Sequence, residues 1–391
     1  MRLDADKWRA HRGVERILTA LGSADGLTRY VGGAVRDDLM GLPVSDIDFA
    51  TRLMPEQVIA RLEAAHIKAV PTGIEHGTIT AVADGQPAEV TTLRADVSTD
   101  GRRATVEFTD DWMADASRRD FTINALYADP ETGAVHDYFG GLDDLKARRV
   151  RFIGDALTRI AEDHLRILRF FRFHARFGDG EPDQPAIAAC TARANDLMAL
   201  SRERIADELL KLLALSDPSA TVALMVERGI FTPVLPEIIG AERLQALIRA
   251  EAAGGFEPEP LRRLSALLPP DPQVAEAMAV RLKLSNKARK RIALAADNDM
   301  TIGPKALAYW IGTESAIDRL LLAGRHEDAM AVRGWPVPRL PITGGQLIKR
   351  GVTQGPLVAR TLQEIERQWV ASQFPQDEAF EAIVSRNLAA G

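Results

Sequence analysis

The 391-residue chain has a single cysteine and no apolar run long enough to cross a membrane. Cys190 alone can form neither an intramolecular disulfide nor a cysteine-based metal site, which is typical of a reducing compartment. The N-terminal stretch MRLDADKWRAHRG lacks the apolar core of a signal peptide. We therefore expect a cytoplasmic protein without a membrane segment, and the length predicts at least two domains.

Net positive charge is also absent, because 49 Lys and Arg face 55 Asp and Glu and leave a formal net charge of −6. By itself this balance argues weakly against a polyanionic partner. Two local runs differ from it. Eight arginines stand between Arg148 and Arg176 against three acids, and Arg281–Arg291 holds six basic residues and no acid. Such runs are either solvated faces or surfaces that contact phosphate.

Strand and helix patterns alternate over the first 140 residues and then give way to helical periodicity alone. The early part predicts an α+β domain with a mixed sheet. From Leu157 onward nearly every segment predicts helix, interrupted by Gly and Pro. The Pro-rich stretches Glu257–Leu261 and Leu268–Pro272 are the expected joints. The predicted strands are Arg29–Val31, Ile47–Thr51, Thr78–Val82 and Ala88–Leu93, and an early helix is predicted over Pro55–Ala65.

An acidic pair follows a glycine turn. Asp46 and Asp48 stand two apart in a predicted strand, so both carboxylates project from one face. Two like charges this close are costly unless a cation joins them, and oxygen ligands suit Mg²⁺. Upstream, the Gly32-Gly33 turn precedes a predicted helix, where backbone N–H groups and Arg36 can face phosphate. Together these features predict a magnesium–nucleotide site, whereas an isolated Asp-X-Asp is more often a solvated strand end.

Five motifs occur in a fixed order: Gly32–Asp37 with Asp46–Asp48, Arg118–Asn124, Asp137–Leu145, Glu162–Arg166 and Ser201–Leu209. They resemble the motifs of class II tRNA nucleotidyltransferases and bacterial poly(A) polymerases. The resemblance runs without a break from about Tyr30 to Leu213 and less sharply beyond. It implies a nucleotidyltransferase head (1–141) followed by an all-helical neck (142–213), body (214–280) and tail (281–391).

By this resemblance, Asp46 and Asp48 bind two Mg²⁺ ions. One ion would acidify and position the 3′-hydroxyl of an RNA, and the other would stabilise the departing pyrophosphate. Phosphoryl transfer needs mainly positioning and charge stabilisation, so no Ser-His-Asp set is required. Glu89 is the candidate third carboxylate, and an exposed strand residue is an equal interpretation of it.

The resemblance assigns base reading to Glu162, Asp163 and Arg166, on a helix predicted from Leu157 to about Phe177. Asp163 would accept a hydrogen bond from the exocyclic amino group that cytosine and adenine share. Arg166 would donate to the neighbouring ring nitrogen, and Glu162 would hold Arg166. Guanine and uracil carry a carbonyl in place of that amino group and would be rejected. The alternative is a surface ion-pair cluster that contributes little.

The remaining motifs imply supporting roles. Arg119 and Asp120, with Asn124 nearby, would face the ribose, and Arg118 is an alternative phosphate contact. Gly140 and Gly141 would form a hinge, although glycines at a boundary also serve simple chain reversal. The polar segment Asp96–Thr109 is either the flexible loop that the family associates with adding A, or an ordinary connection.

The family places tRNA along its body and tail. We therefore assign contact with the RNA backbone to Lys283, Lys287, Arg289, Lys290 and Arg291. The predicted partners are the tRNA 3′ end, CTP and ATP, and the oligomeric state stays open.

The leading hypothesis is a CCA tRNA nucleotidyltransferase, which transfers C, C and A to tRNA 3′ ends without a nucleic-acid template. The alternative is a poly(A) polymerase, and Thr72–Thr80 with Glu89–Arg94 resemble the tRNA enzymes more closely. An enzyme adding C alone would lack the flexible loop. A catalytically silent RNA-binding protein conflicts with the intact Asp46/Asp48 pair. A dinucleotide-binding oxidoreductase is excluded because the glycine turn has no G-x-G-x-x-G fingerprint.

Overall fold

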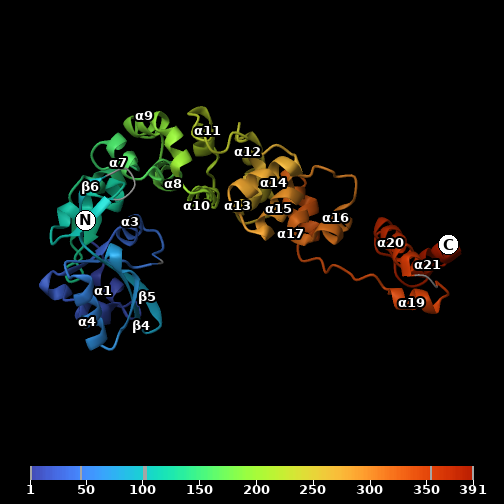
Figure 1. Cartoon of the computed structure of the whole chain (residues 1–391), viewed down its shortest axis with the longest axis horizontal. Helices are drawn as coiled ribbons and strands as arrows, with labels where there is room; N and C mark the ends of the chain where they lie inside the picture. The colour runs from blue at the N-terminus through green and yellow to red at the C-terminus, as the bar shows by residue number, and fades with distance from the viewer. Residues whose placement is uncertain (1, 45, 100–103, 353–354, 390–391) are drawn as a thin grey trace. The chain divides into compact units, whose positions relative to one another are not determined.

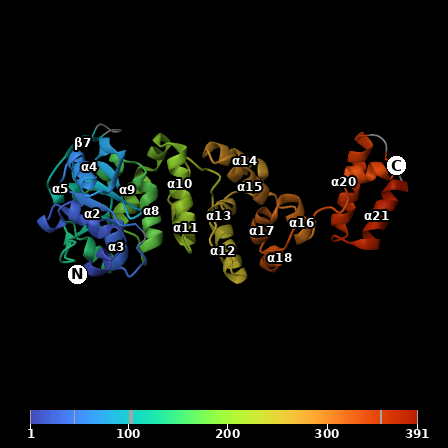
Figure 2. The same ribbon diagram turned by 90° about the horizontal axis from the view of Figure 1, so that it is seen from below.

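The computed structural model describes residues 2–44, 46–99, 104–352 and 355–389, and its contacts divide the chain into two compact units. The first unit comprises residues 1–201 and 228–233, and the second comprises residues 202–227 and 234–391. The described strands all belong to the first unit, and the second is built of helices (Figures 1 and 2). This confirms the predicted α+β part followed by helical modules.

A mixed seven-stranded sheet with the order β3-β4-β5-β2-β1-β8-β9 is the frame of the first unit. Strands β2 and β5 run parallel, with Phe49 opposite Val90, and the other neighbouring pairs are antiparallel. Strands β6 and β7 form a separate antiparallel ribbon. The strands are β1 (Thr28–Val31), β2 (Phe49–Thr51), β3 (Lys68–Gly73), β4 (Thr78–Ala83), β5 (Gln86–Thr92), β6 (Arg94–Thr99), β7 (Ala104–Phe108), β8 (Leu126–Ala128) and β9 (Val135–Asp137).

Helices pack against the strands of the sheet. In β4 every second residue is buried, which is the pattern of a strand with one covered face. Helices α2 and α4 pack against β4, and α3 packs against β1 and β8. The helices of this unit are α1 (Ala5–Arg9), α2 (Val14–Ala20), α3 (Gly33–Leu39), α4 (Pro55–Ala64), α5 (Trp112–Ser117), α6 (Gly141–Lys146), α7 (Ala156–Glu162), α8 (Arg166–Phe177) and α9 (Gln184–Ala192).

An aromatic cluster fixes α8 against the chain segments next to it. The rings of Phe121 and Phe152 have centroids 5.0 Å apart, and Phe170 stacks on Phe152 at 5.7 Å. Phe173 lies 5.2 Å from Phe121, and all four side chains are buried. Because aromatic burial contributes strongly to packing, this cluster holds α8 and the arginines on it in one place.

The segment from Leu157 to Phe177 is two helices, so the prediction of one continuous helix was wrong. Helix α7 ends at Glu162, and Asp163 has the extended backbone angles φ −150° and ψ 106°. The Asp163 carboxylate accepts a hydrogen bond from Leu165 N at 3.1 Å, and its carbonyl accepts one from Arg166 N at 3.0 Å. These bonds give hydrogen-bond acceptors to the backbone N–H groups of Leu165 and Arg166, at the break where the next helix begins.

The second unit contains only helices among its described elements. Glu257–Leu261 begins after α12 and ends in the first turn of α13, and Leu268–Pro272 begins after α13 and ends at the first residue of α14, so both predicted joints fall where one helix gives way to the next. The helices are α10 (Arg202–Leu213), α11 (Ser219–Glu227), α12 (Glu242–Gly254), α13 (Pro260–Ala266), α14 (Pro272–Arg281), α15 (Asn286–Ala296), α16 (Pro304–Ile311), α17 (Thr313–Leu322), α18 (His326–Val332), α19 (Gly344–Lys349), α20 (Gly355–Ala371) and α21 (Asp377–Ala389).

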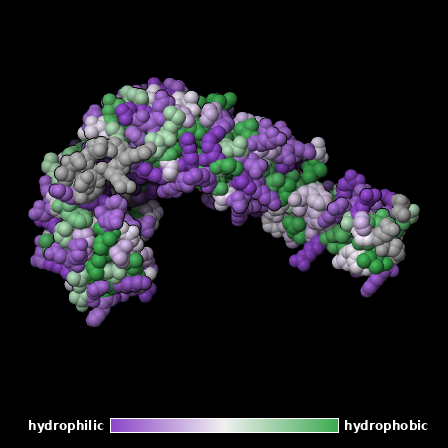
Figure 3. All heavy atoms as spheres, viewed as in Figure 1, coloured by the Kyte–Doolittle hydropathy of each residue, from purple (hydrophilic) through white to green (hydrophobic). Residues whose placement is uncertain are grey.

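Apolar side chains are scattered in small groups among hydrophilic ones on the face seen in Figure 3. A buried cluster that includes Ile365, Trp369 and Val384 holds α20 and α21 together. Within the described ranges, none of the helices combines the length and the apolar character that a membrane crossing requires.

Candidate functional site

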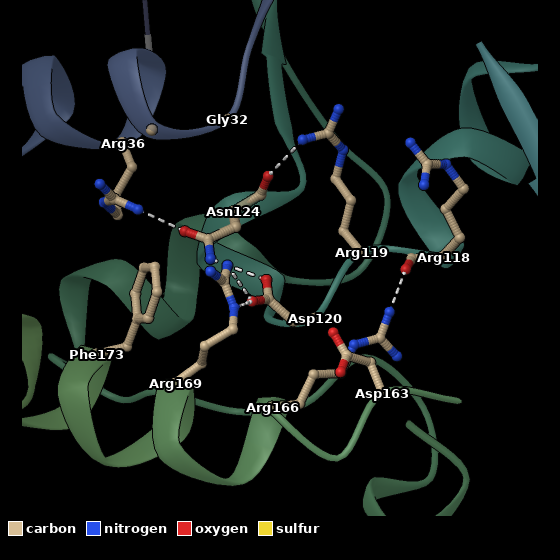
Figure 4. Close-up of a pocket in the computed structure, with 11 residues that line it drawn as sticks. Gly32, Arg36, Arg118, Arg119, Asp120, Asn124, Asp163, Arg166, Arg169 and Phe173 are labelled. Carbon is tan, nitrogen blue, oxygen red and sulfur yellow. Dashed lines mark hydrogen bonds and ion pairs between the residues drawn. The ribbon is translucent and has the colours of Figure 1, made fainter. Parts of the chain in front are cut away.

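A cavity of about 480 Å³ brings together three of the motifs found in the sequence (Figure 4). We name it the nucleotide cavity. Its lining comes from the glycine turn and α3, from the segment around η3 (Thr122–Asn124), and from the α7–α8 break with α8. The lining residues are Gly32, Gly33, Arg36, Arg118, Arg119, Asp120, Asn124, Asp163, Arg166, Arg169 and Phe173.

The glycine turn lets the backbone approach the cavity closely. Gly32 has φ +70° and ψ −123°, a conformation that side chains disfavour. A Cβ atom there would stand 3.3 Å from Arg119 Nη1. Helix α3 begins at the next residue, so the start of the helix borders the cavity, as the sequence predicted.

Arg36 is buried, and its guanidinium is engaged mainly by other residues of the protein. Its Nε donates to Asp37 Oδ1 at 2.8 Å, and its Nη1 donates to Asn124 Oδ1. The guanidinium lies 4.1 Å from the centroid of the Phe177 ring. Arg36 therefore ties α3 to Asn124 and to the end of α8, while still lining the cavity.

Asp120 is the centre of a hydrogen-bond network that links Asn124 and Arg169, two other residues lining the cavity (Figure 4). Its Oδ1 accepts from Phe121 N at 2.8 Å and from Asn124 Nδ2 at 2.9 Å, and its Oδ2 accepts from Arg169 Nε at 2.7 Å. Burial opposes ionisation of Asp120, but Arg169, Asn124 and the Phe121 N–H together lower its pKa. Arg169, which the sequence analysis missed, stands three residues after Arg166 on α8 and lines the same cavity.

Asp115 is a second residue that the sequence analysis missed. This buried carboxylate accepts from Arg118 Nε at 3.0 Å, from Arg119 Nη2 at 3.3 Å and from the Tyr127 hydroxyl at 2.6 Å. Burial raises the pKa of Asp115, but Arg119 and Arg118 outweigh burial and lower it to about 2. Asp115 stands three and four residues before the two arginines, a spacing that brings side chains together in a helical turn, and this spacing was the available signal.

The three predicted base readers lie together. Arg166 Nη1 donates to Glu162 Oε2 and to the Arg159 carbonyl at 2.9 Å, and its Nη2 donates to the Arg118 carbonyl at 2.9 Å. Three of the five guanidinium N–H groups are thus used to fix the side chain. Asp163 lines the cavity beside Arg166 because the helix break turns it out of the helical face.

The acidic pair lies at a second cavity, of about 370 Å³, which we name the carboxylate cavity. Asp46 and Asp48 precede β2, so the prediction that they lie within the strand was wrong by a few residues. The ladder nevertheless reaches Asp48, whose carbonyl accepts from Val31 N at 3.1 Å, and the intervening Ile47 is buried. Glu89 precedes Val90, the β5 partner of Phe49, and lines the same cavity.

The carboxylates repel one another. Burial, together with the negative charges of Glu89 and Asp46, raises the pKa of Asp48 to about 6, and Arg119 acts in the opposite direction. A cation would remove this repulsion, and the donors are the oxygen ligands that Mg²⁺ prefers, so the residues fit that ion. Over the described ranges, no three His, Cys, Asp or Glu side chains already form a metal-binding group.

Arg119 connects the two cavities. It lines the nucleotide cavity, and its charge lowers the pKa of Asp48 in the carboxylate cavity. Its Nε donates to the Tyr127 hydroxyl at 3.2 Å, and Asp115 holds the other end of the guanidinium.

The predicted hinge is closely packed. Asp137 accepts from Gly141 N and Leu142 N, each at 2.9 Å. A Cβ atom on Gly141 would stand 2.8 Å from the carbonyl carbon of Thr122, and Gly140 has φ +79°. Close approach of two backbones is therefore sufficient reason for glycine here, and the hinge stays a prediction.

The segment Asp96–Thr109 is mostly strand. Strands β6 and β7 pair Arg94 with Phe108 and Asp96 with Val106, so the expected loop is an antiparallel ribbon. Its tip, residues 100–103, lies outside the described residues. The association of this segment with adding A stays a prediction.

The two basic runs are more compensated than their sequences indicate. In the first run, Asp144 pairs with Arg149 and Arg151, and Asp37 pairs with Arg176. These carboxylates come from outside the run, so the local excess of positive charge does not survive folding intact.

In the second run, Lys287 and Lys290 are exposed on α15, Lys283 pairs with Glu203 at 2.8 Å, and Arg289 stands 3.5 Å from Glu276. Arg291 differs from these residues. Its guanidinium, only 11% exposed, pairs with Asp318 at 2.5 Å, Glu314 at 2.6 Å and Glu259 at 2.8 Å. We therefore exclude Arg291 from the predicted RNA contacts, because three carboxylates already neutralise it.

Comparison with known proteins gives consistent relationships. The family described as "Poly A polymerase head domain" matches residues 28–151, and the family described as "Probable RNA and SrmB- binding site of polymerase A" matches residues 182–241. CCA tRNA nucleotidyltransferase 1, mitochondrial, of Mus musculus is 36% identical over 90% of this chain and 84% of its own length. The CCA-adding enzyme of Limosilactobacillus fermentum is 32% identical over 92% of this chain and 93% of its own.

A solved structure, the Bacillus stearothermophilus CCA-adding enzyme in complex with CTP, superposes with a TM-score of 0.72 at 25% identity. The superposition covers 96% of this chain and 98% of that chain. Sequence relatives and fold agree over almost the whole length. The chain belongs to the family of CCA-adding tRNA nucleotidyltransferases.

Proposed function

We propose that this chain transfers C, C and A in turn from CTP and ATP to the 3′ end of tRNA, and that protein side chains select the base. The observation that carries the proposal is the fixed Arg166 beside Asp163. Arg166 is held by Glu162 and by two backbone carbonyls, so it meets a base in one orientation. Such a pre-organised pair can replace a template strand, because unpaired polar groups penalise the wrong base.

Asp163 and Arg166 are complementary to the edge that cytosine and adenine share. An ionised Asp163 accepts from the amino group, and the remaining N–H groups of Arg166 donate to the ring nitrogen beside it. Uracil and guanine place a carbonyl against Asp163, which sets two acceptors face to face. Both residues line the nucleotide cavity, and Asp163 itself terminates α7.

The ribose and phosphates are assigned to the other lining residues. Gly32 and Gly33 border the cavity with backbone, which suits close contact with a triphosphate. Arg119 lines the nucleotide cavity and its positive charge acts on Asp48, so it can stabilise the negative charge that develops during transfer. Asp120 accepts three hydrogen bonds from the protein, so its proposed role toward the ribose is to position Asn124 and Arg169.

Asp46 and Asp48 are proposed to hold Mg²⁺, with Glu89 as the third candidate ligand. Bound there, two ions supply activation of the RNA 3′-hydroxyl and stabilisation of pyrophosphate. Burial and the neighbouring carboxylates raise the pKa of Asp48. The repulsion among these carboxylates supports the assignment, since a bound cation would relieve it.

The tRNA is proposed to use Lys283, Lys287, Arg289 and Lys290 for backbone contact. The division of the helical part at residues 213 and 280, the hinge at Gly140-Gly141 and a cytoplasmic location stay predictions. The mouse relative is named as a mitochondrial protein.

The test is incorporation into a tRNA that lacks its 3′ CCA, with Mg²⁺ and each labelled nucleoside triphosphate in turn. Two C and one A should be added, and the reaction should then stop. Long A tracts on arbitrary RNA would instead favour the poly(A) polymerase. A tRNA that already ends in CCA is the control and should gain nothing.

A further inference from the structure

The carboxylate cavity continues into a third depression on the side of the molecule that carries the α1–α2 turn. This depression, of about 170 Å³, is lined by His11, Arg12, Val14, Ile17, Ile47, Gln86, Pro87 and Ala88. We name it the basic cleft. It shares Ile47, Pro87 and Ala88 with the carboxylate cavity, so the two form one continuous groove. Among the described residues that line the basic cleft, none is acidic.

Arg12 is the charged side chain of this cleft. It is exposed, and within the described part of the chain its guanidinium has no hydrogen-bond or ion-pair partner. Most other arginines of this unit are engaged, for example Arg16, which pairs with Asp84 at 2.6 Å. An unengaged guanidinium beside an apolar floor of Ile47, Pro87 and Ala88 suits a ligand with both an anionic and a flat apolar part.

The position of the groove relative to the chemistry identifies that ligand. The nucleotide cavity and the carboxylate cavity share no described lining residue, yet they adjoin. The carbonyl of Asp48 in the second accepts a hydrogen bond at 3.1 Å from the backbone N–H of Val31, the residue before Gly32 of the first. The carboxylates therefore stand between the nucleotide cavity and the basic cleft. In phosphoryl transfer the attacking and leaving oxygens lie roughly in line, on opposite sides of the phosphorus. With the nucleoside triphosphate on one side, the attacking hydroxyl approaches from the other.

We propose that the basic cleft binds the last single-stranded nucleotides of the RNA that receives the new residue, with Arg12 on a phosphodiester of that strand. The inference rests on the proposed function, since it assigns the second substrate of the same reaction. Ile47, Pro87 and Ala88 offer an apolar surface to a base or ribose. Arg12 offsets the repulsion between the phosphates of the strand and the carboxylates Asp46 and Glu89.

The distinguishing experiment measures each substrate separately. In the full-length protein, Arg12→Ala should raise the KM for tRNA lacking CCA about tenfold and leave the KM for CTP unchanged. Because one phosphate contact is lost, the dependence of log Kd on log[KCl] should become shallower by about 0.7 for a single strand. Arg12→Lys, which keeps the charge, should recover most of the affinity.

Arg16→Ala is the matched control. It removes the same charge from the adjacent helix α2, but Arg16 is engaged by Asp84 and does not line the groove. It should leave both KM values and the salt dependence unchanged. Direct binding is measured by the fluorescence anisotropy of a labelled tRNA. Arg12→Ala should weaken the binding of a tRNA with a single-stranded 3′ end. It should leave unchanged the binding of a tRNA trimmed to a blunt acceptor stem.

Three outcomes would overturn the inference. In the first, Arg12→Ala leaves both KM values and the salt dependence unchanged, as Arg16→Ala does. In the second, it raises the KM for CTP and not that for tRNA. In the third, it weakens the binding of the blunt tRNA as much as the binding of the tRNA with a single-stranded 3′ end. The proposed function fails differently, because the wild-type protein would then add no CCA at all. If it still bound the single-stranded 3′ end through Arg12, the basic cleft would stand without that function.

Discussion

Replacing Asp115 by Asn tests whether one buried carboxylate organises the arginines between the two cavities. The Asp115 side chain is 1% exposed, and those of Arg118 and Arg119 are 19% and 21% exposed. Asn keeps the shape and removes the charge, so both arginines lose the anion that holds them. An uncompensated pair of arginines at this position is expected to affect both stability and catalysis.

The magnitude follows from the pKa of Asp115. Burial raises it, but Arg119 and Arg118 lower it to about 2 from an ordinary 3.8. A difference of about two units corresponds to about 2–3 kcal/mol of unfolding free energy at neutral pH. Because the folded pKa is depressed, this stabilisation is present in full above about pH 5 and is lost as the pH falls through about 2. The difference between wild type and Asp115→Asn should follow that window.

The assay is urea unfolding at fixed pH together with steady-state incorporation of CTP. At pH 7 the variant should unfold at lower urea, and kcat/KM for CTP should fall about tenfold or more, since Arg119 is no longer held. Asp143→Asn is the control. The Asp143 side chain is 84% exposed, and its ion pair with Lys146, at 3.5 Å, is an exposed one that contributes little to stability. Equal unfolding midpoints and equal activity for Asp115→Asn and wild type would refute the reasoning.

Three further predictions concern separate parts of the site. Asp48→Ala should reduce nucleotide incorporation at least about a thousandfold. Chelating Mg²⁺ should reduce the activity of the wild type in the same way until Mg²⁺ is restored. Undiminished activity in either experiment would contradict the metal assignment. Glu162→Ala leaves Arg166 with its two carbonyl partners only. KM for CTP and ATP should therefore rise, and discrimination against UTP should weaken about tenfold; an unchanged ratio of kcat/KM values would oppose this. Gly141→Ala places a Cβ within 2.8 Å of the carbonyl carbon of Thr122, so unfolding should become easier by about 1–3 kcal/mol; a melting temperature equal to that of wild type would contradict the close packing.

The sequence predicted the members of the site better than their geometry. Ordered motifs identified Gly32, Asp120 and Asp163, which the fold collects in one cavity. The break at Asp163 was not predictable from local pattern, because no Gly or Pro interrupts the segment. It is stabilised by a contact distant in sequence, from Arg166 Nη2 to the Arg118 carbonyl.

Charge was the least predictable property, because a sequence shows which residues carry charge and not which partners neutralise it. Arg291 stands in the most basic run of the chain, yet its carboxylate partners Glu259 and Asp318 come from distant segments. Asp115 has the spacing of an ordinary surface ion pair, and only its burial distinguishes it. Arg12 stands in an N-terminal segment without a motif, and only the folded chain places it in a cleft that shares Ile47, Pro87 and Ala88 with the carboxylate cavity.

The most direct test of the account is the base selectivity of Asp163→Ala. The measurement is kcat/KM for CTP, UTP, ATP and GTP on tRNA lacking CCA, for wild type and variant side by side. Wild type should strongly prefer CTP over UTP and ATP over GTP, and Asp163→Ala should lose most of both preferences while still adding nucleotides slowly. Preferences that survive intact in Asp163→Ala would contradict the claim that protein side chains in this cavity read the base.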